Sequence, residues 1–145
     1  MIASSNQYVA FLSPTYSGRV HDAQVAHLEN CQFPESIRVY KDLGYLGYQP
    51  DGPTLMAPIK KTRKAALSAL QKWYNTTNAK VRVYVEHAIA GIKRCRIIKD
   101  RCRINYPLRD QCLLLATGLH NLRVFLIEEN ITSKSILNAL NNILA

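Results

Sequence analysis

The order of hydrophobic and polar positions predicts a mixed α/β protein, with strands near the N-terminus and helices after them. Residues 7–13 are aromatic and β-branched and run into a turn of Pro and Gly, which predicts a strand. Residues 23–30 predict a helix capped by Asp22, and residues 37–43 predict a second strand. The prolines and the glycine of residues 50–58 predict a long irregular connection.

The second half of the chain has the apolar spacing of amphipathic helices. A helix is expected from residue 61 to 74, and the polar run at 75–78 is expected to separate it from the next one. Pro107 suits the first position of a last long helix, and Thr132 or Ser133 would cap a short separate C-terminal helix. The apolar stripe of the middle helix comprises Val81, Val85, Ala88, Ile89 and Ile92. The last long helix is expected to bury Cys112, Leu115, Leu119, Leu122 and Leu126.

Length and composition favour a single soluble domain. The 145 residues are 48% hydrophobic, which is enough for one core. No apolar stretch approaches the ~20 residues that cross a bilayer, and the N-terminus lacks the pattern of a signal peptide, so a cytoplasmic protein is expected. The four cysteines have no C-x-x-C spacing and the four histidines no H-E-x-x-H spacing, so both types are expected to be structural rather than metal ligands.

Positive charge is concentrated in one segment. The formal net charge is +9, yet residues 60–109 contain 14 Lys and Arg against only Glu86 and Asp100. The remainder of the chain is slightly acidic. A basic surface of this kind binds polyanions such as nucleic acids, because neutralised phosphates release their condensed counterions. A merely solvated helix face is the alternative explanation.

Two carboxylates stand where phosphodiester chemistry would use them. Asp42 lies at the end of a predicted strand in front of a glycine loop, and Glu86 is the lone acid in a basic helix. Enzymes that cut DNA commonly hold two divalent metal ions with carboxylates, and hard oxygen ligands suit Mg²⁺ or Mn²⁺. The structural alternatives are a turn or cap role for Asp42 and an ion-pair role for Glu86.

Three sequence blocks follow one another along the chain. Residues 16–22 read Tyr-Ser-Gly-Arg-Val-His-Asp, residues 41–45 read Lys-Asp-Leu-Gly-Tyr, and residues 85–94 read Val-Glu-His-Ala-Ile-Ala-Gly-Ile-Lys-Arg. In order and spacing they resemble the Gly-x-Val-His-Asp, Asp-x-Gly-Tyr and Val-Glu-Arg blocks of the DDE transposases of insertion sequences and their Harbinger-like relatives. The resemblance covers most of residues 8–123, and His87 stands where the family more usually has arginine.

The resemblance implies an α/β fold of the ribonuclease H-like type, a mixed sheet flanked by helices. Residues 1–130 would be the C-terminal portion of the catalytic domain, and residues 131–145 a short final helix. Asp42 and Glu86 would be the catalytic carboxylates and metal ligands, with Mg²⁺ or Mn²⁺ as the cofactor. Trp73 and Tyr74 would either stack on distorted DNA or pack in the core. The DNA phosphates would be bound by Lys93, Arg94, Arg96, Lys99, Arg101 and Arg103.

The first catalytic aspartate of the family lacks a counterpart in this chain. Residues 1–7 contain no aspartate, and Asp22 aligns with a residue that starts a helix. The catalytic fold is therefore expected to be incomplete at its N-terminus, and the chain to be inactive or nearly so alone. The expected function is DNA transposition, by metal-dependent strand cleavage and strand transfer at transposon ends and target DNA. A complementing N-terminal transposase chain and a homo-oligomer are the expected partners. The alternative is a non-catalytic basic nucleic-acid-binding protein or an inactive transposase relic.

Overall fold

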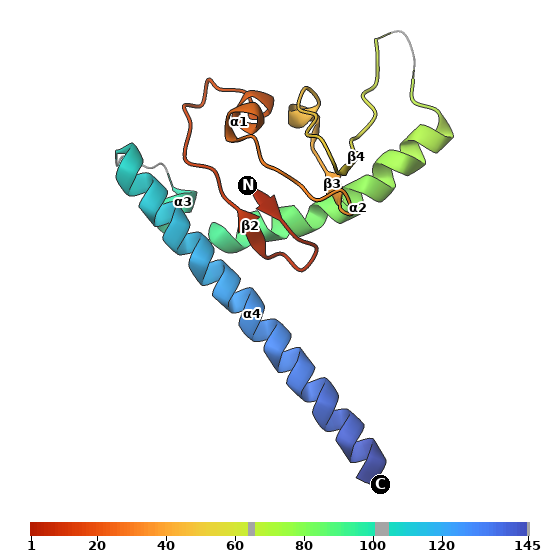
Figure 1. The fold of residues 1–145 in the computed structure, drawn as a ribbon, viewed down its shortest axis with the longest axis vertical. Helices are drawn as coiled ribbons and strands as arrows, with labels where there is room; N and C mark the ends of the chain where they lie inside the picture. The colour runs from red at the N-terminus through yellow and green to blue at the C-terminus, as the bar shows by residue number, and fades with distance from the viewer. Residues whose placement is uncertain (64–65, 101–104, 145) are drawn as a thin grey trace. The chain divides into compact units, whose positions relative to one another are not determined.

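The computed structural model describes residues 1–63, 66–100 and 105–144, and over these ranges the chain is a mixed α/β protein (Figure 1). The expected mixture of strands and helices is confirmed. The described strands form two separate two-stranded sheets, β1-β2 and β3-β4. The chain divides into a terminal unit, Met1–Leu12 with Tyr84–Ala145, and a central unit, Ser13–Val83. Helix α2 (Ala69–Ile92) contributes residues to both units.

A β-hairpin opens the terminal unit. Strand β1 (Ile2–Ala3) pairs antiparallel with β2 (Val9–Phe11), so the strand expected at 7–13 is shorter than predicted and has a partner before it. In the connection, the Gln7 N–H donates to the Ser4 carbonyl at 3.0 Å. Gln7 has a φ of 72°, a left-handed conformation that costs a residue with a side chain roughly 1–2 kcal/mol.

The core of the terminal unit is made by small and medium apolar residues of three elements. Val9 of β2, Ala88 and Ile92 of α2, and Ala116 of α4 (Tyr106–Leu144) are buried in one cluster. Ala88 and Ile92 belong to the apolar stripe expected from the sequence, whereas Ile89 of that stripe is 37% exposed. Short helix α3 (Arg96–Lys99) lies between α2 and α4 along the chain. Partly buried residues that pack against the cluster are Met1, Ala3, Cys95, Ile98 and Leu113.

Two polar side chains of α4 bind the backbone of the hairpin. The Val9 N–H donates to Asn121 Oδ1 at 2.9 Å, and Asn121 Nδ2 donates to the Val9 carbonyl at 2.9 Å. His120 is 4% exposed, and its Nε2 lies 2.9 Å from the Gln7 carbonyl oxygen. A Cβ on Gly91 of α2 would lie 2.2 Å from His120 Nδ1, so the contact requires glycine. His120 is therefore structural, as expected.

The central unit contains short elements joined by loops. They are α1 (Asp22–Glu29), β3 (Arg38–Tyr40), the 3₁₀ helix η1 (Leu43–Tyr45), β4 (Thr54–Met56) and the first part of α2. Strands β3 and β4 are parallel, with Tyr40 opposite Met56, and β4 lies in the segment expected to be irregular. His21 occupies the N-cap of α1, so the expected capping role of Asp22 is wrong and Asp22 is the first helical residue.

Helix α2 runs through the polar segment 75–78 without the expected break. Thr76 Oγ1 donates to the Lys72 carbonyl at 2.9 Å and Thr77 Oγ1 to the Trp73 carbonyl at 3.0 Å, so both hydroxyls bond back onto the helix. The start of α2 also differs from the prediction. Ser68 and Gln71 form a reciprocal capping box, in which each side chain accepts from the backbone N–H of the other.

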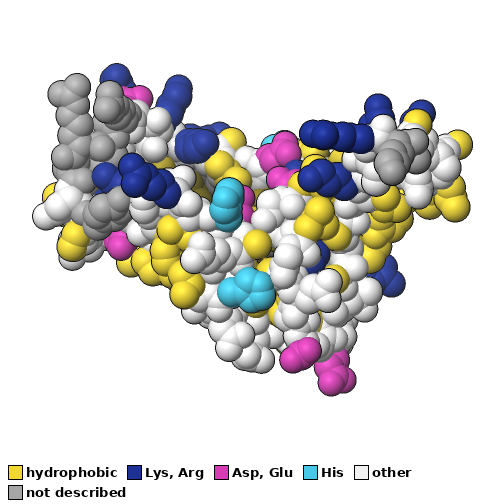
Figure 2. All heavy atoms as spheres, turned by 90° about the horizontal axis from the view of Figure 1, so that it is seen from above, with side chains coloured by type: hydrophobic (Ala, Val, Ile, Leu, Met, Phe, Trp, Pro, Cys, Tyr) yellow, Lys and Arg dark blue, Asp and Glu magenta, His cyan; other side chains and the backbone are white. Residues whose placement is uncertain are grey.

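Helix α4 is unbroken from Tyr106 to Leu144, so the expected separate helix beginning at Thr132 or Ser133 does not form. The expected buried face is also wrong, because the leucines at 115, 119, 122 and 126 are 67%, 54%, 53% and 49% exposed. Among the α4 side chains that the structure describes, the buried ones are Ala116, Thr117, His120 and Val124. Hydrophobic side chains are accordingly visible on the surface in Figure 2. Among the described residues, no helix combines the length and apolar character needed to cross a membrane.

Candidate active site

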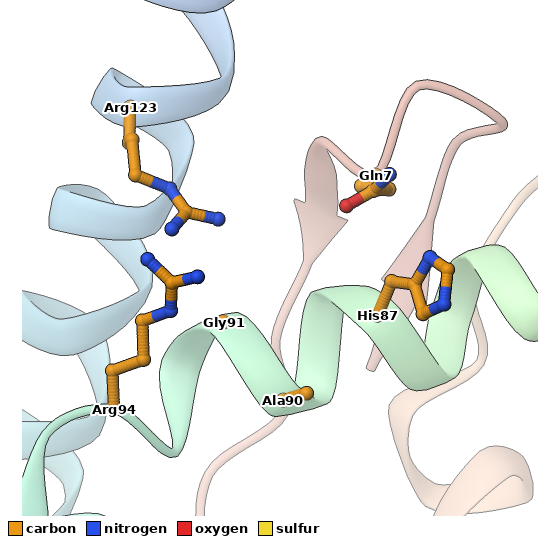
Figure 3. A pocket seen from close by; sticks show the side chains of 6 residues that line it. All are labelled: Gln7, His87, Ala90, Gly91, Arg94 and Arg123. Atoms are coloured by element: carbon orange, nitrogen blue, oxygen red, sulfur yellow. The ribbon is translucent and has the colours of Figure 1, made fainter.

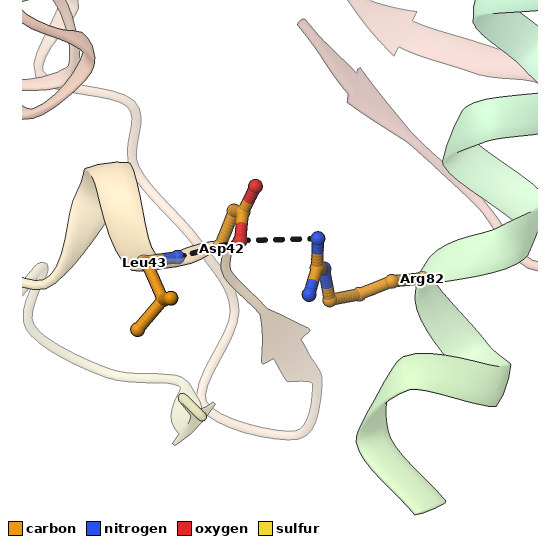
Figure 4. Close-up of polar contacts among 3 residues, drawn as sticks. All are labelled: Asp42, Leu43 and Arg82. Carbon is orange, nitrogen blue, oxygen red and sulfur yellow. Dashed lines mark hydrogen bonds and ion pairs between the residues drawn. The ribbon is translucent and has the colours of Figure 1, made fainter. Parts of the chain in front are cut away.

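Asp42 lies two residues after the end of β3 and is the N-cap of η1. Its Oδ1 accepts from the Leu43 backbone N–H at 2.7 Å and pairs with the Arg82 guanidinium at 3.0 Å (Figure 4). The Asp42 side chain is 53% exposed and that of Arg82 28% exposed. The capping role that the sequence left open is thus observed. The second carboxylate oxygen, Oδ2, has no hydrogen-bond or ion-pair partner among the described residues and is available to a ligand.

The loop after Asp42 packs against the start of α1. A Cβ on Gly44 would lie 2.6 Å from Asp22 Oδ2, so only glycine fits beneath that carboxylate. Burial raises the pKa of the Tyr45 phenol, and the negative charges of Asp22 and Asp42 raise it further. The sequence blocks at residues 16–22 and 41–45 therefore contact each other in the central unit, and the charges of both aspartates act on the Tyr45 phenol.

Lys41, beside Asp42, is a buried cation that holds the same loop. Its side chain is 9% exposed, and Nζ donates to the Tyr48 carbonyl at 2.6 Å. Burial lowers the pKa of this amine. The Lys41 backbone N–H also donates to the Met56 carbonyl at 3.1 Å, which extends the pairing of β3 with β4. These contacts fix the backbone from which the Asp42 side chain projects.

Glu86 lies on α2 in the terminal unit, and its side chain is exposed. Within the described ranges its carboxylate has no hydrogen-bond or ion-pair partner, so the ion-pair role left open by the sequence is not observed. Glu86 follows Arg82, the partner of Asp42, by one turn of the same helix. A helical turn places such side chains on one face of α2.

The two candidate carboxylates belong to different compact units, Asp42 to the central unit and Glu86 to the terminal unit. No group of three or more His, Cys, Asp or Glu side chains in the described part of the chain is placed to hold a metal ion. The candidate site therefore consists of the accessible carboxylates of Asp42 and Glu86, and Arg82 orients that of Asp42.

The candidate DNA-binding residues lie at the end of α2 and in α3. Lys93, Arg94, Arg96 and Lys99 are exposed, whereas Arg101 and Arg103 lie outside the described residues. Arg96 pairs with Asp100 at 3.6 Å, and both side chains are largely exposed. Figure 2 shows Lys and Arg side chains outnumbering Asp and Glu on the face in view. An exposed basic surface fits the polyanion partner expected from the charge distribution.

Trp73 and the cysteines bear on two further expectations from the sequence. Trp73 is 65% exposed, so core packing is wrong for this residue. Cys31, Cys95 and Cys112 are free, as expected, and Cys102 lies outside the described residues. Burial raises the pKa of the Cys31 thiol, which favours the unreactive protonated form.

Two residues of the site were missed by the sequence reasoning. Arg82 was counted only as part of the basic segment, and Tyr45 only as part of a motif, although both interact with Asp42. Their relation to Asp42 depends on how separate elements pack. The only signal in the sequence was their position in or beside the recognised blocks.

Comparisons with known proteins agree with these motifs. A family model described as DDE superfamily endonuclease matches residues 1–121. The protein described as "Probable transposase for insertion sequence element IS702" from Microchaete diplosiphon is 29% identical over 104 residues. That match covers 72% of this chain and 38% of the relative, so the chain spans less than half of the relative's length. No solved structure matches the chain significantly.

Proposed function

Because the chain belongs to the DDE superfamily endonucleases, we propose that it is the C-terminal portion of a transposase catalytic domain. Its role would be metal-dependent DNA strand cleavage and strand transfer, with transposon ends and target DNA as substrates and the cytoplasm as its location. We further propose that the whole catalytic domain has a ribonuclease H-like fold and that this chain forms its later elements. The relative named as a probable transposase supports this interpretation.

The observation that carries the proposal is the state of the two carboxylates. Asp42 is held at a strand end through Oδ1, by a backbone N–H and by Arg82, while Oδ2 is left for a ligand among the described residues. Glu86 is exposed and lies one turn after Arg82 on α2. Asp42 Oδ2 and the Glu86 carboxylate are therefore accessible to a ligand.

The donor set fits a hard divalent cation. Mg²⁺ is commonly bound by one or two carboxylates, and water and substrate phosphate oxygens complete its coordination. Asp42 and Glu86 would supply the protein ligands in this chain. A divalent ion bound there would activate a water or hydroxyl nucleophile and stabilise the leaving oxygen of the phosphodiester.

The chain's own residues have separable roles in this proposal. Arg82 is a positioning residue, because its ion pair restricts the rotation of the Asp42 carboxylate. Lys41 and the Gly44 turn fix the Asp42 backbone. Lys93, Arg94, Arg96 and Lys99 would bind DNA phosphates and so place the scissile bond, together with Arg101 and Arg103.

A complementing polypeptide would supply the first catalytic aspartate. The exposed apolar face of α4 supports such a partner, because large contiguous apolar surface is usually covered in the functional assembly. Leu115, Leu119 and Phe125 of this face are 67%, 54% and 53% exposed. A second copy of the chain, in a homo-oligomer, would cover the same face in part.

Plasmid nicking tests the proposal. The chain is combined with the N-terminal portion of a DDE transposase catalytic domain, which carries the first aspartate, and incubated with supercoiled DNA that contains transposon ends, with and without Mg²⁺. Nicking should require Mg²⁺ and should be abolished by Asp42→Ala and by Glu86→Ala. Asp51→Ala and Glu129→Ala, which remove other exposed carboxylates, serve as matched controls. Full activity in either Asp42→Ala or Glu86→Ala would refute the site.

A non-catalytic nucleic-acid-binding role is the second candidate, favoured by the exposed basic side chains of α2 and α3. DNA binding that falls steeply with salt is expected from both candidates. The binder alone predicts that Mg²⁺ has no effect on any combination of chain, partner and DNA. Nicking and binding measured on the same samples therefore separate the two.

A further inference from the structure

A small pocket lies within the terminal unit, and one of its lining residues, His87, directly follows Glu86 in the sequence. Its volume is about 230 Å³. Side chains of the hairpin, of the end of α2 and of α4 converge on it (Figure 3). The residues that line it are Gln7, His87, Ala90, Gly91, Arg94 and Arg123.

Two arginines dominate the pocket. Figure 3 shows the guanidinium groups of Arg94, at the end of α2, and Arg123, on α4, pointing toward one another. Neither forms an ion pair with a carboxylate of the described residues. Within the described part of the chain, Arg123 Nε is also buried without a hydrogen-bond partner. Two cations that converge in this way repel each other, and a buried donor without a hydrogen bond destabilises the folded state.

Residues of α2 and of the hairpin form the rest of the pocket wall. Gly91 and Ala90 leave space beside the arginines, and Gly91 is required there by the buried His120 ring. Gln7 lines the opposite side in a left-handed conformation, with φ of 72°. Its carbonyl oxygen lies 2.9 Å from His120 Nε2.

We propose that this pocket binds a phosphate group between Arg94 and Arg123. Guanidinium groups bind phosphate through paired, charge-assisted hydrogen bonds, and an anion between Arg94 and Arg123 would remove the repulsion between the two arginines. The volume is below the roughly 300–1,000 Å³ of pockets that hold drug-sized ligands, so it suits one phosphate group rather than a large cofactor. His87 also lines the pocket.

The phosphate has two sources, a backbone phosphate of DNA or a free phosphate ion. The DNA source rests on the proposed function, because it extends the basic surface of α2 and α3 onto α4. Arg123 lies outside the basic segment of the sequence and so was not among the predicted DNA contacts. In the DNA case the pocket fixes the register of the strand and reads no base sequence.

Substitution of Arg123 tests the pocket with DNA as the probe. Affinity for a labelled duplex is measured by fluorescence anisotropy over a series of salt concentrations for the full chain, Arg123→Gln and Arg123→Lys. Arg123→Gln should lose roughly tenfold in affinity, and the slope of log K against log salt should fall by about 0.9, the value for one phosphate. Arg123→Lys should restore the slope but not the affinity, because lysine lacks the planar fork. Lys134→Gln, an exposed cation on the same helix, is the matched control.

Thermal unfolding with inorganic phosphate tests the pocket independently of DNA. Phosphate, compared with chloride at equal ionic strength, should raise the Tm of the wild-type chain and of Lys134→Gln but not of Arg123→Gln. Circular dichroism of each variant without ligand establishes that it is folded. A phosphate response without any Arg123 effect on DNA binding would support the site and assign it to free phosphate.

The proposal is overturned if Arg123→Gln matches the wild type in both measurements, or if Arg123→Lys matches it in both. A wild-type response of Arg123→Gln would mean that no phosphate binds in the pocket. A wild-type response of Arg123→Lys would mean that binding depends only on positive charge and not on the guanidinium group. Loss of nicking in the complemented enzyme would leave these results unchanged, and failure of the wild type to bind DNA would count against the proposed function alone. The two proposals therefore fail separately.

Discussion

Substitution of Gly91 by alanine tests the packing that holds α2, α4 and the hairpin together. A Cβ at this position would lie 2.2 Å from Nδ1, 2.5 Å from Cε1 and 3.3 Å from Cγ of His120. The His120 ring is 4% exposed and is held at Nε2 by the Gln7 carbonyl at 2.9 Å. The ring therefore cannot move aside without breaking that hydrogen bond or separating the helices.

The expected destabilisation combines three terms. Overpacking of a core costs about 1–3 kcal/mol, and loss of the hydrogen bond from His120 to Gln7 costs about 1 kcal/mol more. Alanine is favoured over glycine inside a helix by about 1 kcal/mol, which offsets part of the cost. Gly91→Ala should therefore lower the free energy of unfolding by about 1–3 kcal/mol.

Urea denaturation followed by circular dichroism at the helical band measures this change. Gly118 of α4 provides the matched control, because a Cβ there meets no atom within 4 Å. Gly118→Ala should stabilise the protein by up to about 1 kcal/mol, so the two glycine variants should shift in opposite directions. The double variant Gly91→Ala with His120→Ala should lose less than the sum of its single changes, because the smaller residue makes room for the Cβ.

A Gly91→Ala variant as stable as Gly118→Ala would contradict the close packing of the His120 ring on Gly91. That result would mean that the His120 ring does not occupy the space beside Gly91. Additive single changes in the double variant would lead to the same conclusion, since residues in contact should couple.

Three further predictions concern the central unit and α4. The pKa of Tyr45 is raised in the folded state, first by burial and then by the charges of Asp22 and Asp42. The neutral phenol therefore contributes to folding stability below the ordinary pKa of tyrosine, and this contribution is lost as the pH rises through the folded-state pKa. Asp42→Asn should therefore lower the Tyr45 pKa. This pKa is measured from the pH dependence of tyrosinate absorbance, and the Tyr45→Phe variant identifies the part of the signal that belongs to Tyr45. An unchanged titration would show that the charge of Asp42 does not act on the Tyr45 phenol. Arg82→Gln should lower the free energy of unfolding by less than about 1 kcal/mol, because its ion pair with Asp42 is partly exposed. The same variant should reduce Mg²⁺-dependent nicking by the complemented enzyme several-fold. Nicking equal to that of the wild type would show that Arg82 does not position Asp42. Leu115→Gln with Leu119→Gln should leave the unfolding midpoint of the monomer unchanged and reduce self-association measured by light scattering; a large drop in stability would show that these leucines are core residues.

The sequence predicted the order of elements better than their lengths. Helix α1 and strand β3 were expected nearly where they lie, because both follow short hydrophobic patterns bounded by turn residues. Strand β4 was missed, since its three residues lie among prolines and glycine and gain their conformation from parallel pairing with β3. Such pairing is a contact distant in sequence, which local patterns do not contain.

Polar residues in α2 misled the prediction for a different reason. The run at 75–78 has the composition of a loop, but the hydroxyls of Thr76 and Thr77 bond back to the helix. Asn75 bonds both backbone groups of Ile59, at 2.8 Å and 2.9 Å. Tertiary contacts thus use the same side chains that suggested a break. The Ser68 and Gln71 capping box was a readable signal that was overlooked.

Leucine spacing on α4 predicted the wrong face. The small residues Ala116 and Thr117 and the polar His120 are buried, because close approach of α2 and the hairpin requires small side chains and hydrogen-bond donors. Hydrophobicity alone favours the leucines as core residues, and it gives no information on surfaces that another polypeptide covers. The candidate carboxylates, by contrast, could be read from the motifs, while the pairing of Asp42 with Arg82 could not.

The central claim is that Asp42 and Glu86 hold a divalent metal ion, and paramagnetic broadening by Mn²⁺ tests it most directly. Amide signals of the ¹⁵N-labelled chain are recorded during titration with Mn²⁺, alone and together with its partner polypeptide. If the two carboxylates bind the ion, broadening begins at residues 42–45 and 85–87 and is lost in both Asp42→Ala and Glu86→Ala. Broadening that is centred on other carboxylates, or that persists unchanged in both variants, would contradict it.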